Sequence, residues 1–75
     1  ALIQQRAGEI LETITRPMTL DQITGAVCTR YQLFTKKPSR ALRFQRNIRL
    51  FLDFLMDEGL VELRPSKGVI WYSRV

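Results

Sequence analysis

The stretch from Arg40 to Glu58 limits most strongly what this chain can fold into. It contains no glycine and no proline, and its apolar residues recur at steps of three and four. On a helix, with about 100° between successive residues, six of them fall on one side: Ala41, Phe44, Ile48, Phe51, Leu52 and Leu55. The pattern therefore predicts one long amphipathic helix over about 39–58.

The ends of this long helix carry their own signals. Ser39 is a plausible N-cap, and Thr35 is an alternative that places Pro38 in the first turn. At the other end, Gly59 is expected to adopt the left-handed conformation that closes many helices. Asp57 and Glu58, just before Gly59, lie at the unfavourable end of the helix dipole, which costs the helix a little stability.

Two shorter helices are predicted before it. A stripe at helical spacing predicts the first over Leu2–Thr15, ended by Arg16-Pro17 because the residue before proline avoids the α region. Thr19 and Gln22 form a capping box for the second, which is expected to end near Val27 or Cys28. The stripe of the first helix consists of Ile3, Ala7, Ile10, Leu11 and Ile14.

The segment 29–38 has no clear period, and we expect a loop there with up to one helical turn. Its aromatic residues, Tyr31 and Phe34, are expected to pack as a satellite of the core. Cys28 is interpreted as a small buried apolar residue rather than a reactive thiol.

The last part of the chain predicts a β-hairpin. Leu60–Leu63 reads as a short strand, 64–68 as a turn with proline and glycine, and Val69–Val75 as a second strand. The aromatic pair Trp71 and Tyr72 is expected to close the core. The fold class is mainly α with a small C-terminal β-hairpin, as one domain over 1–75, since 75 residues hardly allow two domains.

Composition excludes several kinds of function. The chain has no histidine and a single cysteine, so an internal disulfide and a zinc site are both excluded. With no glycine-rich phosphate loop either, we expect no enzyme, no cofactor and no small-molecule substrate. The most apolar window, Leu50–Leu55, is far shorter than the roughly 20 residues of a membrane span. We expect no membrane association and a cytoplasmic (nucleoid-associated) or nuclear protein that is not secreted.

The charge is concentrated in the middle of the chain. The net charge is +5, yet no acidic residue lies between Asp21 and Asp53. That window holds seven bases: Arg30, Lys36, Lys37, Arg40, Arg43, Arg46 and Arg49. Such a basic region favours an anionic partner. The plainer interpretation is a solvated helix face, and an acidic protein partner fits as well.

The order helix, helix, helix, hairpin resembles the winged helix-turn-helix superfamily over nearly the whole chain. The most specific piece is the junction Phe51–Leu63, which looks like the end of a recognition helix, a glycine cap and the first wing strand. Met18–Ile23 looks like the opening of the second helix, where Met18 would add a short strand to the sheet. The chain departs from the family in one respect. About ten residues separate Val27 from Ser39, whereas a typical helix-turn-helix has three or four.

The resemblance implies double-stranded DNA binding, with the third helix in the major groove and the wing on phosphate or the minor groove. On the third helix, Arg43, Arg46 and Arg49 point away from the apolar stripe and, with Arg40 and Asn47 beside them, suit phosphates or base edges. Lys36 and Lys37 at the helix entrance suit phosphates. The full set of expected DNA contacts is Arg30, Lys36, Lys37, Ser39, Arg40, Arg43, Arg46, Asn47, Arg49, Arg64 and Lys67.

The leading hypothesis is a sequence-dependent DNA-binding module of a transcription regulator or a replication or partition factor. Two alternatives stay open: a winged helix used for protein contacts within an assembly, and RNA or single-strand binding through the basic face with Trp71 or Tyr72. Both a monomer and a homodimer fit the sequence.

Overall fold

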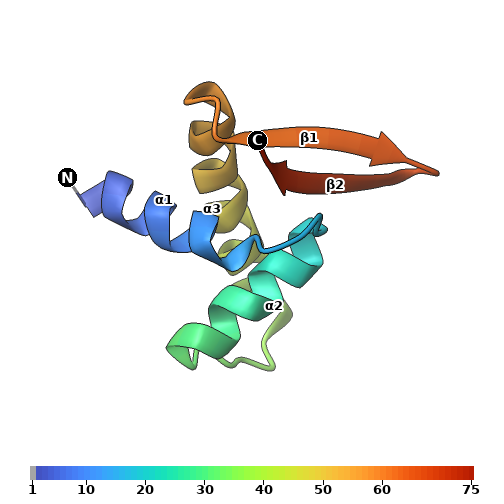
Figure 1. Cartoon of the computed structure of the whole chain (residues 1–75). Coiled ribbons are helices and arrows are strands. Elements are labelled where there is room, and N and C mark those ends of the chain that lie inside the picture. The colour runs from blue at the N-terminus through green and yellow to red at the C-terminus, as the bar shows by residue number, and fades with distance from the viewer. Residues whose placement is uncertain (1) are drawn as a thin grey trace.

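The computed structural model describes the backbone of residues 2–75 and the side chains from residue 5 onward. Three helices, α1 (Leu2–Thr13), α2 (Leu20–Tyr31) and α3 (Pro38–Asp57), are followed by an antiparallel hairpin of β1 (Val61–Ser66) and β2 (Val69–Arg74). In Figure 1, α1 crosses α3, and the hairpin projects away from the three helices. The predicted fold class is confirmed, and the layout is compatible with a winged helix.

The core lies where α1 and α2 pack against α3. It draws on all three helices, on the connection between α1 and α2 and on the root of the hairpin: Ala7, Ile10, Ile14, Met18, Ile23, Val27, Ile48, Leu52, Leu55, Val61 and Tyr72. The predicted stripes supply most of it, although the side chain of Ile3 lies outside the described part of the chain. On α3, Ala41 is exposed rather than buried, because its turn faces the α2–α3 connection, where it borders a hollow with Leu33 and Phe34.

The capping box of α2 is confirmed. The Gln22 backbone N–H donates to the Thr19 hydroxyl at 3.2 Å, and the Thr19 N–H donates to the Gln22 side chain at 3.1 Å. The predicted end near Val27 or Cys28 is wrong, since the helix continues to Tyr31 and closes at Gln32, which has a left-handed φ of 55°.

Contacts with α1 explain the extra turn of α2. Arg30 and Tyr31 both donate hydrogen bonds to α1, so tertiary contacts extend the helix beyond its local signals. The connection to α3 shrinks to Gln32–Lys37, shorter than the roughly ten residues expected. Tyr31 packs against the core as predicted, but Phe34 is 75% exposed, so its assignment to a core satellite is wrong.

The start of α3 differs from the prediction, while its end agrees with it. Lys37 is the N-cap and Pro38 lies at the first position, so Ser39 is not the cap; Thr35 instead accepts a local bond from the Lys37 N–H at 3.1 Å. Gly59 has the expected positive φ of 76°. The Leu60 N–H reaches the Leu55 carbonyl at 3.0 Å, which completes a Schellman closure.

The hairpin is longer and its turn tighter than predicted. Only Lys67 and Gly68 form the turn, with φ of 51° and 79°, as a two-residue type I′ turn requires. The expected turn residues before them belong to β1, where Pro65 pairs with Ile70. Proline is tolerated there because β1 is an edge strand in a two-stranded sheet. At the root, Met18 forms an isolated antiparallel bridge to Tyr72, so the contact with the sheet that the resemblance implies is present as one bridge and not as a strand.

Candidate nucleic-acid interface

The candidate interface is built on the side of α3 that faces away from the core. Ile48, Leu52 and Leu55 bury one side of the helix. Residues about 180° away, at 100° per residue, therefore point to solvent. We call the following set the outward face of α3, and each of its members is exposed: Arg43, Arg46, Leu50, Asp53 and Asp57.

The basic side chains on α3 and in the segment that precedes it have no ion-pair partner among the described residues. Among the described residues, the two ion pairs are Arg30–Glu12 and Arg64–Glu62, and neither uses an arginine of α3. All of the following are exposed: Lys36, Lys37, Arg40, Arg43, Arg46 and Arg49. The structure therefore presents six cations from one helix and the segment that enters it, as the sequence predicts. An anion that reaches α3 meets no competing carboxylate bound to them.

The N-terminal end of α3 suits an anion as well. Lys37 caps it through the backbone only, with no side-chain hydrogen bond. Ser39 stands exposed in the first turn beside Arg40. Uncapped N–H groups and the positive end of the helix dipole favour a phosphate oxygen at such a place.

Arg30 has a partner within the fold. Its guanidinium donates to the Glu9 carbonyl at 3.2 Å and pairs with Glu12 at 3.3 Å. It also lies 5.5 Å from the centre of the Tyr31 ring. This predicted DNA contact thus ties α2 to α1, and the charge that it offers to a ligand is partly neutralised.

The same corner holds a hydrogen bond from Tyr31 to Glu9. The Tyr31 hydroxyl donates to the Glu9 carboxylate at 2.5 Å. This bond, with desolvation, raises the pKa of Tyr31 above its ordinary value, and the nearby charge of Arg30 works in the opposite direction. The phenol therefore stays protonated at neutral pH, where it acts as a tie between helices.

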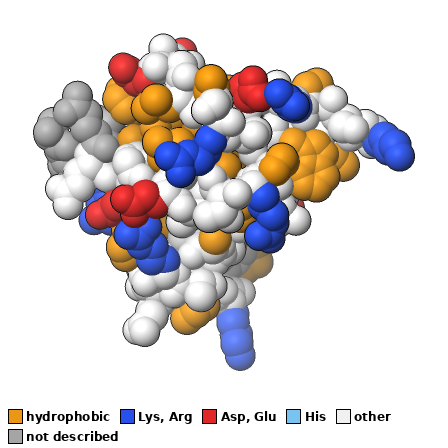
Figure 2. Space-filling view, viewed as in Figure 1, with side chains coloured by type: hydrophobic (Ala, Val, Ile, Leu, Met, Phe, Trp, Pro, Cys, Tyr) orange, Lys and Arg blue, Asp and Glu red, His pale blue; other side chains and the backbone are white. Residues whose placement is uncertain are grey.

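The two predicted wing contacts differ in their surroundings. Arg64 pairs with Glu62 on its own strand at 2.6 Å, whereas Lys67 lies in the turn at the far end of the hairpin. Figure 2 shows a basic side chain at that outer end. The face drawn there also mixes acidic and basic side chains over the helices, so it is not uniformly basic. Lys67 is thus the better placed of the two for an anionic ligand.

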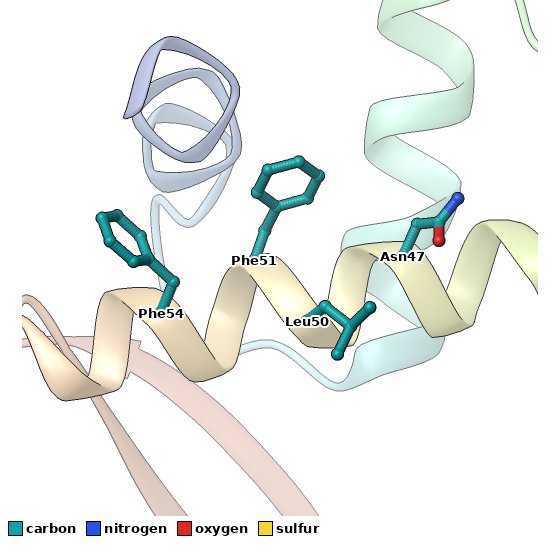
Figure 3. A pocket seen from close by; sticks show the side chains of 4 residues that line it. All are labelled: Asn47, Leu50, Phe51 and Phe54. Carbon is teal, nitrogen blue, oxygen red and sulfur yellow. The ribbon is translucent and has the colours of Figure 1, made fainter. Parts of the chain in front are cut away.

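Apolar side chains accompany the basic ones on α3, a feature that the sequence reasoning missed. Leu42 is 66% exposed and Leu50 59% exposed. Leu50 also lines a shallow groove with Asn47, Phe51 and Phe54. Figure 3 shows the two phenylalanines pointing toward α1 and Leu50 on a different side of the helix. Leu42 and Leu50 lie outside the predicted apolar stripe and among arginines in the sequence, and that position is the signal that could have revealed them.

The comparisons with known proteins add no family. The chain matches none of the family models, curated proteins or solved structures with which it was compared. Within the described residues, no helix combines the length and the apolar character needed to cross a membrane.

Proposed function

We propose that this chain is a winged-helix module that binds double-stranded DNA, with α3 against the major groove and the hairpin tip on the neighbouring backbone. One observation carries the proposal: the arginines of α3 point away from the core, and no ion pair within the described residues neutralises them. Holding such charges together is unfavourable, and phosphates relieve that cost.

Affinity and sequence preference would come from different side chains. Lys36, Lys37 and Lys67 have the reach and charge for phosphate contacts, which position a protein without reading sequence. Arg43 and Arg46 can lie bidentate on guanine, and Asn47 can do so on adenine. Leu50 among them offers an apolar contact to a thymine methyl group.

The role in the cell follows from the partner. A sequence-dependent duplex binder of this size fits a transcription regulator or a replication or partition factor, in the compartment that holds the DNA. Both roles use the same surface, so binding itself is the property to test first.

The test compares two double variants that remove the same number of arginines. Arg43→Ala/Arg46→Ala removes two outward arginines of α3, while Arg30→Ala/Arg64→Ala removes two that have partners in the fold. With labelled duplex DNA in fluorescence anisotropy, the first should lose at least about tenfold in affinity and the second less than about threefold, since phosphate and base contacts are each worth about 1 kcal/mol or more.

Competition distinguishes the remaining nucleic acids. Unlabelled duplex DNA should displace the probe at lower concentration than duplex RNA or single strands, because α3 fits the DNA major groove and not the deep, narrow groove of RNA. Tighter binding of RNA or of single strands would contradict the duplex-DNA proposal. An equal loss of affinity in both double variants would show that α3 is not the DNA-binding surface.

A further inference from the structure

The charges on the outward face of α3 follow an order along the helix. Its two arginines, Arg43 and Arg46, lie in the N-terminal half, and its two aspartates, Asp53 and Asp57, lie in the C-terminal half. Leu50 stands between the two pairs. At about 100° per residue all five fall within roughly 80° of one another, so they form one straight stripe.

This stripe is nearly symmetric in sequence about Leu50. Arg43 lies seven residues before it and Asp57 seven after it. Seven residues are about two helical turns, so both side chains stand above and below Leu50 on the same side. Arg46 lies four residues before Leu50 and Asp53 three after it, so this second pair of opposite charges flanks Leu50 at about one turn on each side.

We propose that a second copy of this chain binds this face, with the two α3 helices antiparallel and Leu50 packed on Leu50 of the other copy. A twofold axis at Leu50 then brings Arg43 of each copy level with Asp57 of the other, and Arg46 close to Asp53. The same surface meets itself, as a twofold dimer requires. A parallel pair would place Arg43 beside Arg43, so the charges select the antiparallel arrangement.

The surroundings of Leu50 agree with a helix as the occupant. Leu50 borders a groove that Asn47, Phe51 and Phe54 line on one flank of the stripe, so the apolar surface at the centre of the stripe is wider than one leucine. Helices in contact lie about 8–10 Å apart, within reach of arginine and aspartate side chains. None of the four charged residues has an ion-pair partner in the described part of the chain.

The expected dimer is weak. A single pair of helices buries less than the roughly 1,200 Å² of standard stable interfaces. Self-association should therefore depend on protein concentration, and salt should weaken it because the ion pairs are exposed. This inference does not need DNA binding. Where both hold, DNA and the second copy compete for Arg43 and Arg46.

The decisive experiment uses complementary charge reversals and sedimentation equilibrium without DNA. Arg43→Asp places aspartate against Asp57 twice in its own dimer, and Asp57→Arg places arginine against Arg43 twice. Each variant alone should dimerise at least about tenfold more weakly than the wild-type chain, since several exposed charge contacts change sign. Mixed in equal amounts, the two variants form attractive pairs at both ends, and the dimer should return.

Two matched variants control for net charge. Arg49→Asp on α3 and Glu58→Arg at its C-cap make the same charge changes, about 80–100° from the middle of the stripe, and should leave self-association within about threefold of wild type. The double variant Arg43→Asp/Asp57→Arg restores complementarity within one chain and should dimerise like wild type. Circular dichroism verifies that each variant is folded.

Two results would overturn the inference. One is a wild-type chain that stays monomeric at millimolar concentration. The other is an equimolar mixture of Arg43→Asp and Asp57→Arg that associates no better than either alone, which would place any dimer on another surface. If the wild-type chain binds DNA but does not self-associate, only the dimer inference is wrong. If it dimerises but does not bind DNA, only the proposed function is wrong.

Discussion

Met18 and Tyr72 exchange two backbone hydrogen bonds, 2.9 Å from the Met18 nitrogen to the Tyr72 carbonyl and 2.7 Å from the Tyr72 nitrogen to the Met18 carbonyl. Both side chains are buried. The segment between α1 and α2 thereby holds the root of the hairpin against the helices. The outer part of the hairpin is exposed, so the anchored root supports a tip that can meet a partner.

Tyr72→Ala should destabilise the chain strongly. The ring belongs to the core, and truncating a large buried aromatic residue costs about 3–5 kcal/mol. Tyr72→Phe keeps the ring and should change the free energy of unfolding by less than about 1.5 kcal/mol. Urea unfolding followed by circular dichroism measures both. Equal stability of the two variants would contradict the anchoring role of the ring.

The same substitution should have opposite effects at two glycines. Gly25 lies inside α2 with open space around an added methyl group, so Gly25→Ala should stabilise by about 0.5–1 kcal/mol. Gly68 has a φ of 79° in the turn, so Gly68→Ala should destabilise by about 1–2 kcal/mol. Thermal unfolding of both variants measures the change, and a shift of the melting temperature in the same direction for both would contradict the structure.

Removing the cap of α2 should cost a moderate amount of stability. Thr19→Ala loses the hydroxyl that accepts the Gln22 N–H, a change worth about 1 kcal/mol. Thr19→Ser retains an acceptor and should stay within a few tenths of wild type. Chemical denaturation of the three chains checks this order. An alanine variant as stable as the serine one would mean that the cap contributes nothing.

The tie between Tyr31 and Glu9 predicts a pH dependence at the alkaline end. The hydrogen bond to Glu9 raises the pKa of Tyr31 above its ordinary 10.0. A raised folded-state pKa means that the stabilisation is complete below pH 10.0 and is lost as the pH rises through the folded value. Glu9→Gln removes the carboxylate and should lower the pKa of Tyr31.

Tyrosinate absorbance against pH measures that shift, with Tyr31→Phe identifying the signal of this residue. Stability measured on both sides of pH 10.0 should show the wild-type chain losing its advantage over Glu9→Gln as the pH rises. An unchanged titration of Tyr31 in Glu9→Gln would contradict the assignment of the hydrogen bond.

Features that depend on nearby residues could be predicted from the sequence. Thr19 and Gln22 identify the start of α2, Gly59 identifies the end of α3, and the apolar spacing identifies which side of α3 is buried. The exposure of the α3 arginines follows from the same spacing. Each of these signals lies within a few residues of the structure that it determines.

Features that depend on residues far apart in the chain could not be predicted from the sequence. The last turn of α2 forms because Arg30 and Tyr31 bind α1, about twenty residues away in the chain, and no local pattern announces that contact. The sequence places the hairpin turn too early because Pro65 resembles a turn residue. The two-residue turn at Lys67 depends on strand pairing. Within the candidate interface, only the fold shows that Arg30 and Arg64 have partners.

The most direct test of the account is the salt dependence of duplex DNA binding, measured for the wild-type chain and for Arg43→Ala/Arg46→Ala. About five phosphate contacts predict a loss of roughly 500-fold in wild-type affinity over a fourfold rise in salt. The double variant should show a slope of log affinity against log salt that is shallower by up to about 2 units. A flat wild-type response, or identical slopes for the two chains, would contradict DNA binding through α3.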